Sequence, residues 1–353
     1  MLGKKKDVIA IDIGSSSIKL VEISESKRGY TLTNFGMAEL HPETIVDGAI
    51  MDTAAVVDAI QSLIGGLKIK VKDVVTSVSG NAVRIQKITL PTMSQSELEE
   101  SIQWEAEQYI PFDISDVNID FQILDTLDDG SGQMEVILAA AKKDVINEYV
   151  AVITEAGLNV VVMDVDCFAL ENMYDVNYQF ETGDIIALVN VGASLTNINI
   201  MKNGISSFTR DISSGGNQYT EELQKRFSIS YDEAEALKVG KGGGRDISTE
   251  EIMKVIDQVS GDIVASEIQK TFDYFLSQGT ADMINKIYLG GGTSKTNNLT
   301  RMIQDKSGIA VEKINPFANI EYNERHFDAA YIQDIAPYGA VGVGLALRKV
   351  GDR

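Results

Sequence analysis

One hairpin pattern occurs twice in the chain, and this duplication limits the folds that the sequence can adopt. Residues 8–19 contain an unbroken run of branched apolar residues that leads into Asp12, Gly14 and three serines, after which apolar alternation resumes. Residues 185–196 repeat this order around Gly192. A run that is apolar on both faces predicts a buried strand, and the glycine predicts a tight turn into a returning strand. We therefore expect two related halves, each built on a strand, a turn and a strand.

Both turns are suited to binding phosphate. Glycine and small hydroxyl residues leave backbone N–H groups free to face an anion. Asp12 at the end of the first strand can hold a metal-bound water, and Lys19 on the returning strand can reach the same phosphates as a point charge. The alternative is a pair of ordinary turns. Two like hairpins that close on one phosphate chain from opposite sides explain the duplication better than two unrelated turns do.

The composition limits the compartment and the partners. The formal net charge is −21, and the lysine and arginine clusters that neutralise nucleic-acid phosphates are missing, which argues against nucleic acid. The basic residues 4–6 are fewer than the roughly four to eight of a polybasic membrane segment. Cys167 is the only cysteine and His41 and His326 are the only histidines, which disfavours a disulfide framework or a Cys/His metal site. With no membrane span and no signal peptide in the sequence, we expect a cytoplasmic protein of more than one subdomain.

Residues 84–164 have the pattern of a separate α+β module. Ser94 and Glu97 have the spacing of a capping box that opens a helix. Two strands follow, and the Asp-Asp-Gly-Ser-Gly segment at 128–132 predicts the hairpin loop between them. Trp104, the only tryptophan, lies on the predicted helix. It is either a packing residue or an anchor for a partner peptide, since aromatic residues concentrate at binding hot spots.

Two segments of the second half have features of ligand contacts. Glu235 and Lys238 are three residues apart on a predicted helix, so they can pair with each other or reach a sugar hydroxyl. Residues 290–292 are three glycines that let the backbone approach a flat ring or a phosphate. Ser294 then has the position of a helix N-cap.

Several helices are expected from apolar spacing and glycine placement. Residues 249–278 carry a continuous apolar stripe, which predicts one long helix. A helix over 52–64 is expected to end at the Gly-Gly pair that follows it, and the glycine-rich segment 240–244 predicts a loop. The glycines of 336–346 predict a terminal helix that packs closely against another helix.

The order of these elements resembles the actin, Hsp70 and sugar kinase superfamily over nearly the whole chain. The segment Trp-Glu-Ala-Glu-Gln-Tyr-Ile-Pro-Phe at 104–112 resembles the PilM family of type IV pilus assembly proteins, which is related to FtsA of cell division. The resemblance implies an α/β, actin-like (ribonuclease H-like) fold with two related lobes around a nucleotide cleft and an inserted α+β subdomain. It divides the chain into 1–83 (subdomain 1A), 84–164 (inserted subdomain 1C), 165–184 (return to 1A), 185–213 (2A), 214–283 (2B), 284–334 (2A) and 335–353 (terminal helix of 1A).

The same resemblance implies a site for ATP or ADP with Mg²⁺, the ion being held through water on Asp12. The first phosphate hairpin corresponds to Asp12, Gly14, Ser15, Ser16, Ser17 and Lys19, and the second to Asn190, Gly192, Ala193, Ser194 and Thr196. The ribose and purine contacts correspond to Glu235 and Lys238, and the adenosine motif to Gly290, Gly291, Gly292 and Thr293. Gly215 and Gly216 are further expected nucleotide contacts.

The resemblance also implies a partner, the N-terminal cytoplasmic peptide of a PilN-like inner-membrane protein. We expect this peptide to bind between the first and inserted subdomains, in an apolar groove near Leu90, Trp104 and Ile110. FtsA-like proteins finish with a linker and an amphipathic membrane helix, whereas this sequence stops at 347–353. Membrane association is therefore expected only through the partner, at the inner face of the inner membrane. Other pilus assembly proteins are expected partners, and a homo-oligomer or ring stays open.

Asn190 departs from the superfamily pattern, which usually has Asp at this position. An amide can hold a water without activating it, so we expect at most a slow ATPase that acts as a scaffold in fimbrium biogenesis and twitching motility. An FtsA-like cell-division protein and a small-molecule kinase of the same superfamily are the alternatives.

Overall fold

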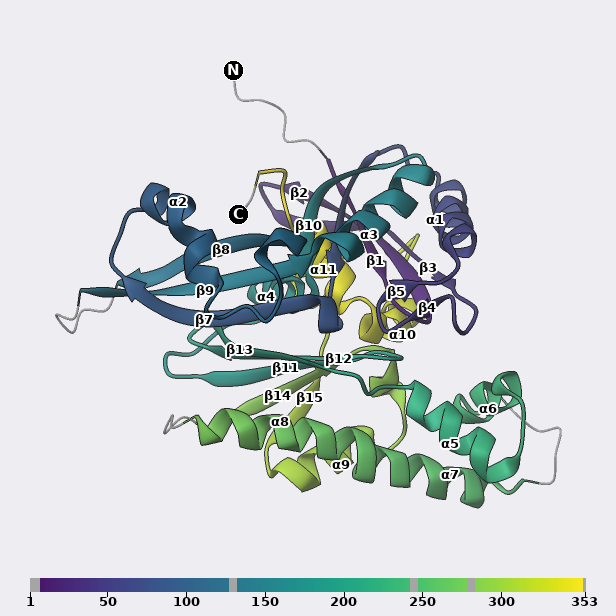
Figure 1. The fold of residues 1–353 in the computed structure, drawn as a ribbon. Coiled ribbons are helices and arrows are strands. Elements are labelled where there is room, and N and C mark those ends of the chain that lie inside the picture. Colours follow the sequence, from purple (N-terminus) through teal and green to yellow (C-terminus); the bar gives the residue numbers. More distant parts are fainter. Residues whose placement is uncertain (1–6, 127–131, 242–246, 279–282, 352–353) are drawn as a thin grey trace.

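The computed structural model describes residues 7–126, 132–241, 247–278 and 283–351. Figure 1 shows two lobes. The first lobe, together with an inserted module, lies above the second, and helices α4 (Asp166–Asn177) and α11 (Ala340–Ala346) lie between the lobes. Each lobe is built on one mixed sheet. The expected actin-like architecture of two related lobes is confirmed by this arrangement.

Five strands of each sheet have the same connectivity, and the first sheet adds a sixth strand beside its meander. In each, a three-stranded antiparallel meander is followed by strands that add in parallel to the other side of its first strand. The first sheet has the order β10 (Asn159–Val165), β6 (Asp73–Val78), β1 (Ile9–Ile13), β2 (Ser17–Ser26), β3 (Gly29–Glu39) and β16 (Ile320–Tyr322). The second has the order β13 (Ile205–Ile212), β12 (Thr196–Lys202), β11 (Ile185–Val191), β14 (Lys286–Gly290) and β15 (Ala310–Lys313). The predicted duplication of the hairpins is thus part of a duplication of five strands.

The central strands β1 and β11 are apolar on both faces because each separates two cores. In β1, Ile9 and Ile11 face the core under α1 (Thr53–Leu67) and α3 (Lys143–Glu155), while Ala10 faces the core of α4 and α11. The alternation follows from the two-residue period of a strand. β11 alternates in the same way between the α4 and α11 core and its own helical layer. One core therefore contains side chains of both sheets and holds the lobes together.

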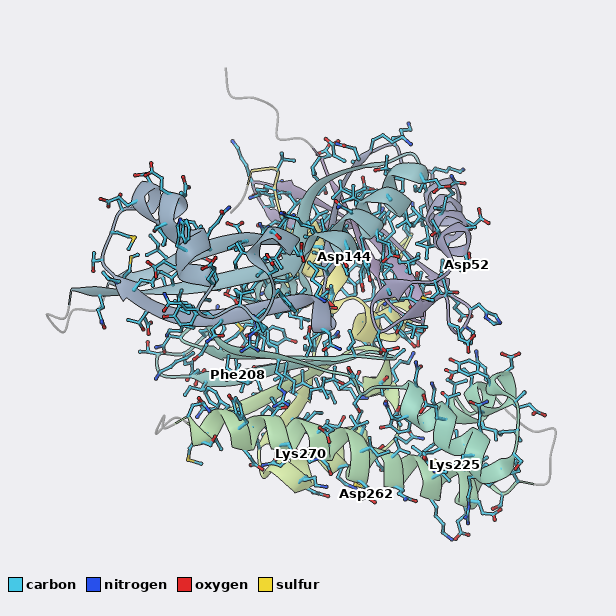
Figure 2. All side chains as sticks on the ribbon, viewed as in Figure 1. Asp52, Asp144, Phe208, Lys225, Asp262 and Lys270 are labelled. Carbon is cyan, nitrogen blue, oxygen red and sulfur yellow. The ribbon has the colours of Figure 1, made fainter. Side chains whose placement is uncertain are left out.

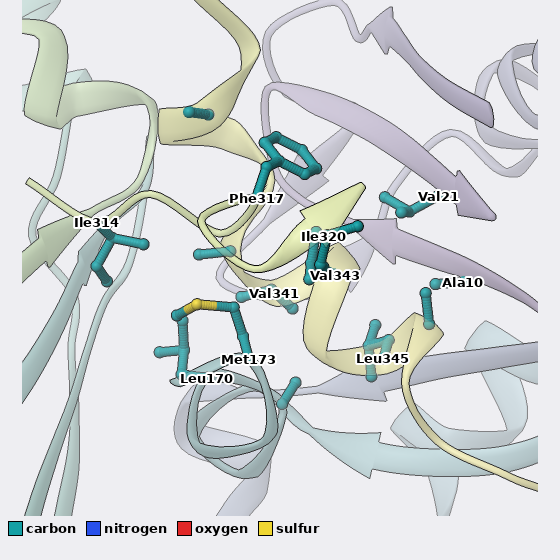
Figure 3. Close-up of a cluster of buried hydrophobic side chains, with 14 of the residues drawn as sticks. Ala10, Val21, Leu170, Met173, Ile314, Phe317, Ile320, Val341, Val343 and Leu345 are labelled. Carbon is teal, nitrogen blue, oxygen red and sulfur yellow. The ribbon is translucent and has the colours of Figure 1, made fainter. Parts of the chain in front are cut away.

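Helix α11 packs against α4 backbone to backbone. A Cβ atom at Gly344 would lie 1.7 Å from the carbonyl oxygen of Ala169, so no other residue fits this crossing. Figure 3 shows Leu170 and Met173 of α4 facing the α11 side chains of the same cluster. The close packing predicted from the terminal glycines is confirmed.

The inserted module is a three-stranded antiparallel sheet with one helix. Its strands have the order β7 (Val83–Pro91), β9 (Gln133–Lys142) and β8 (Val117–Thr126). Helix α2 (Gln95–Ala106) covers one face and begins with the predicted capping box, in which the Ser94 N–H donates to Glu97 Oε2 at 2.7 Å. The predicted hairpin loop at 128–132 lies, except for its last residue, outside the described residues.

Three predictions of local structure were wrong in detail. The helix α1 passes through Gly65 and ends at Leu67, and its C-cap residue Lys68 adopts the left-handed conformation. The expected long helix is interrupted by a π turn at 259–264, so it forms α7 (Thr249–Gln258) and α8 (Ala265–Ser277). Ser294 lies inside the short 3₁₀ helix η4 (Gly292–Lys295) and is not an N-cap.

The remaining elements complete the two lobes. The charged side chains Lys225, Asp262 and Lys270 lie on the outer surface of the second lobe (Figure 2). No helix within the described ranges is long and apolar enough to cross a membrane, and the loop predicted at 240–244 lies largely outside those ranges. The other elements are β4 (Ile45–Val46), β5 (Ala49–Ile50), η1 (Gly80–Ala82), η2 (Ile114–Asp116), α5 (Asn217–Phe227), α6 (Tyr231–Lys238), α9 (Leu299–Ser307), α10 (Ala329–Ile335) and η5 (Ala336–Tyr338).

A buried polar cluster also joins the lobes. Glu171 of α4 contacts the Ser206 hydroxyl of β13. Asn199 donates from Nδ2 to Ser206 Oγ at 2.8 Å and to the carbonyl oxygen of Cys167 at 3.0 Å. Burial raises the pKa of the Glu171 carboxyl group to about 7. This carboxyl group therefore keeps its proton in the folded chain at pH values where it is ionised in the unfolded chain.

We predict that Glu171 makes the stability of the fold pH-dependent. Because its pKa rises from 4.5 to about 7 on folding, its ionisation lowers stability as the pH increases through that window. Relative to wild type, Glu171→Gln should gain about 1–3 kcal/mol in the free energy of unfolding between pH 5 and pH 8. Urea unfolding at both pH values measures this, with Glu100→Gln on the exposed face of α2 as the control. A gain of equal size at both pH values would contradict the assignment.

Candidate nucleotide site between the two hairpins

The first hairpin places a carboxylate and an ammonium group side by side. Asp12 and Lys19 are directly opposite in the β1–β2 register, and Lys19 Nζ lies 3.4 Å from Asp12 Oδ2. Each side chain is 13% exposed. The N–H of Gly14 donates to the carbonyl oxygen of Ser17 at 3.1 Å and closes the turn. Ser15 is half-buried and Ser16 is exposed at its tip.

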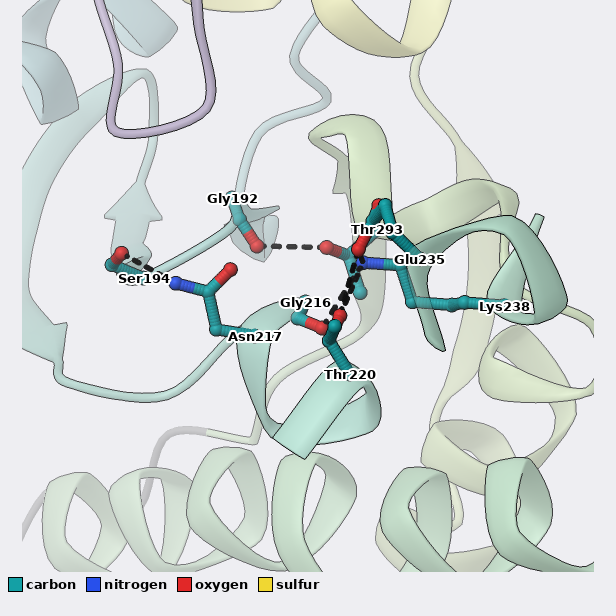
Figure 4. Close-up of polar contacts among 8 residues, drawn as sticks. All are labelled: Gly192, Ser194, Gly216, Asn217, Thr220, Glu235, Lys238 and Thr293. Carbon is teal, nitrogen blue, oxygen red and sulfur yellow. Dashed lines mark hydrogen bonds and ion pairs between the residues drawn. The ribbon is translucent and has the colours of Figure 1, made fainter. Parts of the chain in front are cut away.

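The second hairpin is held by backbone contacts to two other segments. The Gly192 N–H donates to the Leu195 carbonyl oxygen at 2.8 Å, and the Gly192 carbonyl oxygen accepts from the Gly216 N–H at 2.9 Å and from the Thr293 hydroxyl at 2.7 Å (Figure 4). The Thr196 hydroxyl is used within the protein, because it donates to a carbonyl oxygen at 2.7 Å. The turn, the start of α5 and the glycine turn after β14 therefore form one unit.

Only glycine fits at several of these contacts. A Cβ atom at Gly215 would lie 2.5 Å from the Gly192 carbonyl oxygen, and one at Gly291, whose φ is +85°, would lie 2.2 Å from the Val191 carbonyl oxygen. Ala193 and Ser194 complete the turn by bonding Asn217, through the Ala193 carbonyl oxygen at 2.8 Å and the Ser194 hydroxyl at 3.1 Å. The glycines predicted as nucleotide contacts are thus also required for the approach of these backbones.

Glu235 and Lys238 pair with each other beside this unit. Lys238 Nζ lies 2.7 Å from Glu235 Oε2, and the Thr220 hydroxyl donates to the same oxygen at 2.7 Å (Figure 4). Lys238 also donates to the Gly216 carbonyl oxygen at 3.3 Å. The pair joins α6 to the first turn of α5. Neither residue lines the cavity between the hairpins.

The two hairpins meet at one cavity of about 40 Å³. Asp12 and Lys19 line it from the first lobe, and Asn190 lines it from the second. The other lining residues are Gly192, Gly291, Gly292, Tyr338 and Val341. This volume holds only a few waters, at about 10–15 Å³ each. A triphosphate is larger than this volume and would fit here only if the cavity widened.

Tyr338 is a lining residue that the sequence analysis missed. Its ring covers Gly292, where a Cβ atom would lie 2.6 Å from the ring, and Lys295 Nζ lies 5.1 Å above its centroid. The Pro-Tyr-Gly segment that contains Tyr338 was predicted only as part of the terminal helix. Tyr338 is far from both hairpins in the sequence, so no local pattern indicated that it lines the cavity between them.

A larger pocket of about 330 Å³ lies between the first lobe, the inserted module and β13. Gly80, Phe112 and Asp211 are among its lining residues. Asp166 also lines it, and burial together with the nearby Asp12 charge raises the pKa of Asp166 to about 7. Burial also raises the pKa of Asp211, although hydrogen bonds from Asn197 and Gly80 oppose the shift. The sequence analysis did not predict this pocket, although Phe112 ends the segment that carries the resemblance.

The structure does not bring the expected groove residues Leu90, Trp104 and Ile110 together on a surface. Leu90 and Ile110 are 3% and 5% exposed because they form the core of the inserted module, whereas Trp104 is 73% exposed on α2. Two of the three residues are inaccessible to a peptide. A groove built on these three residues is therefore incompatible with the packing.

The side chains at the cavity fit a Mg²⁺ ion that takes most of its ligands from a nucleotide and from water. Within the described parts of the chain, no group of three or more His, Cys, Asp or Glu side chains can hold a metal ion by itself. Mg²⁺ on a nucleotide is bound mainly by phosphates and waters, with one or two protein carboxylates. Asp12 supplies such a carboxylate at the cavity.

The family described as "Type IV pilus assembly protein PilM" has a sequence model that matches residues 10–350. The chain belongs to this family. A solved structure titled "PilM-PilN type IV pilus biogenesis complex" contains a chain with 27% identity and a TM-score of 0.86, and the match covers 99% of this chain and 100% of that one.

Two more distant relatives agree with the actin-like fold of this family. Cell division protein FtsA of Streptococcus pneumoniae serotype 2 (strain D39 / NCTC 7466) is 21% identical over 286 residues, which are 74% of this chain and 61% of FtsA. The chain thus matches less than two thirds of that protein. MreB 5 of Spiroplasma citri, solved with bound AMPPNP, has a TM-score of 0.52 at 16% identity, with 90% of this chain and 93% of that chain covered. At this identity the likeness concerns the fold alone.

Proposed function

We propose that this PilM-family protein binds ATP or ADP with Mg²⁺ between its two hairpins and acts as a nucleotide-dependent scaffold of type IV pilus assembly. The observation that carries this proposal is the convergence of Asp12, Lys19 and Asn190 with two glycine turns on one cavity. Backbone N–H groups of both turns would bind the phosphates, and Lys19 would neutralise part of their charge. MreB 5, which has a similar fold, was solved with bound AMPPNP, and this supports nucleotide binding by a protein of this fold.

The cavity favours binding over rapid catalysis. Bound Mg²⁺ would neutralise phosphate charge, and Asp12 would hold it through water. Asp12 is the only carboxylate among the described residues that line the cavity. Asp166, whose pKa is raised partly by the nearby Asp12 charge, lines the large pocket and not this cavity, so no second carboxylate lines the cavity as a general base for a kinase. Asn190 donates from Nδ2 to Asn197 Oδ1 at 3.1 Å, which leaves its own oxygen to hold a water. An amide oxygen does not take a proton at neutral pH.

We propose the larger pocket as the site of the partner peptide. The chain of the similar structure assembles with PilN, and the family resemblance implies a peptide between the first and inserted subdomains. The 330 Å³ pocket lies there and combines the Phe112 ring with the charges of Arg84 and Asp211. A PilN-like inner-membrane protein bound here would keep the chain at the inner face of the membrane. Contacts with other pilus assembly proteins and ring formation belong to the same proposal.

Hydrolysis should be slow and should depend on position 190. We predict a wild-type turnover below about 1 s⁻¹, the lower end of ordinary enzymes, and a rise of about tenfold in Asn190→Asp, because a carboxylate can accept the proton of an attacking water. Phosphate release under saturating ATP and Mg²⁺ measures both rates. Asn203→Asp, on an exposed turn of the same lobe, is the matched control and should leave the rate unchanged. A wild-type turnover above about 1 s⁻¹, or equal rates in Asn190→Asp and Asn203→Asp, would contradict the role of Asn190.

The peptide site is tested with a synthetic peptide of the cytoplasmic N-terminal segment of PilN. We predict that Phe112→Ala weakens its binding about tenfold, since a buried aromatic contact is typical of binding hot spots. Trp104→Ala should leave binding unchanged, because its side chain lies outside the pocket. Fluorescence anisotropy of the labelled peptide measures both. The opposite ranking of the two variants would locate the peptide on α2 instead.

A further inference from the structure

A chain of three hydrogen bonds runs from the small cavity to the large pocket. Asn190 Nδ2 donates to Asn197 Oδ1 at 3.1 Å, and Asn197 Nδ2 donates to Asp211 Oδ1 at 2.9 Å. The backbone N–H of Gly80 donates to Asp211 Oδ2 at 2.5 Å. Asn190 lines the cavity between the hairpins, whereas Asp211 and Gly80 line the large pocket. We call these three bonds the amide relay.

With Asp211 ionised, the direction of every bond in the amide relay is fixed from its pocket end. A backbone N–H can only donate, and an ionised carboxylate accepts at both oxygens. Asn197 must therefore turn its NH₂ group toward Asp211 and its oxygen toward Asn190. Asn190 in turn donates with its NH₂ group, so that its oxygen is left for the cavity. The orientation of the Asn190 amide at the small cavity is thus determined by the bond between Gly80 and Asp211 at the other end of the relay.

The last bond of the relay crosses between the lobes. Gly80 belongs to η1, between β6 of the first lobe and the inserted module, while Asp211 belongs to β13 of the second. Gly80 has a φ of +76°, and a Cβ atom there would lie 3.1 Å from Leu195 Cδ1 of the second hairpin. Moving the lobes apart, which would widen the small cavity for a triphosphate, stretches this bond.

We infer that Asn197 and Asp211 are positioning residues that couple the two pockets. An ammonium or guanidinium group of a peptide in the large pocket would bind Asp211 in place of the Gly80 N–H. The lobes could then part without leaving Asp211 Oδ2 without a donor, and the small cavity would widen for nucleotide. Peptide and nucleotide therefore strengthen each other's binding by the same factor, as linkage requires. This inference rests on the proposed function, which supplies the two ligands.

The geometry of the relay is tested without any ligand. In Asn190→Asp, carboxylates stand at both ends of Asn197, whose single NH₂ group can face only one of them, and we expect a loss of stability. Adding Asp211→Asn restores a full set of bonds with Asn197 reversed, because the new amide donates to Asn197 and still accepts from Gly80. Urea unfolding should show the double variant recovering most of the stability lost in the single one. If the stability lost in the double variant equals the sum of the losses in Asn190→Asp alone and Asp211→Asn alone, the amide relay is wrong.

The coupling is tested by titrating full-length protein with Mg²⁺ and ATP, with and without saturating synthetic PilN N-terminal peptide. In wild type the peptide should tighten nucleotide binding about fivefold or more, within the range typical of coupled sites. In Asn197→Ala both ligands should still bind, but the factor should fall to about one. In the reversed double variant the factor should also fall to about one, because Asp211→Asn removes the carboxylate that the peptide cation would bind. Binding of both ligands by Asn197→Ala guards against poor folding of that variant.

The outcomes separate the inference from the proposed function. If both ligands bind and the peptide changes nucleotide affinity by the same factor in wild type and in Asn197→Ala, the coupling is wrong and the proposed function stands. Failure of wild type to bind nucleotide or peptide would overturn the proposed function and the coupling together. The unfolding cycle would still report on the amide relay in that case.

Discussion

The backbone contact between α11 and α4 fixes the spacing of the two lobes. Gly344 lies so close to the Ala169 carbonyl oxygen that a Cβ atom would come within 1.7 Å of it. Side chains of both sheets surround this crossing in one core, including Ala10 of β1 and Leu188 of β11. Because each hairpin begins at the end of one of these two strands, the helix crossing also determines how the hairpins face each other. A larger residue at the crossing would displace the whole site.

The site itself is made more of backbone than of side chains. The second hairpin is bound by the carbonyl oxygen of Gly192 and surrounded by glycines that allow no Cβ atom. Backbone N–H groups held in this way need little reorganisation to bind an anion, but they cannot transfer protons. Asp12 supplies the only carboxylate among the described lining residues, and Asn190 supplies an amide. Such a site is suited to holding a nucleotide and to setting the angle between the lobes.

The sequence predicted features that depend on local spacing. Runs that are apolar on both faces identified the central strands, and period-two alternation identified others. The Ser94–Glu97 spacing identified a capping box, and the repeat of the hairpin identified the duplicated lobes. Helix α4 was missed because its buried residues are spread around it, so that no single apolar stripe is visible. The π turn at 259–264 was missed because the apolar stripe continues across it.

Features that depend on long-range packing were not predictable from the sequence. The bond between Gly80 and Asp211 joins residues 131 positions apart. Tyr338 enters the cavity from the end of the chain, and Leu90 and Ile110 are buried by a sheet whose strands are separated in sequence. Their residue types are ordinary, and only the fold gives them a position. The family resemblance led to several residues that meet at the small cavity, among them Asp12, Lys19 and Asn190, but not to the surface of the inserted module.

Isothermal titration of the full chain with ATP and Mg²⁺ tests most directly whether the two hairpins form one nucleotide site. We predict saturable binding of one nucleotide per chain, weakened about tenfold in Lys19→Met by loss of a charge contact worth about 1.4 kcal/mol. Lys225→Met, at a residue whose side chain is 78% exposed on α5, should bind like wild type. An absence of binding heat, or equal affinities in both variants, would contradict a nucleotide site between the hairpins.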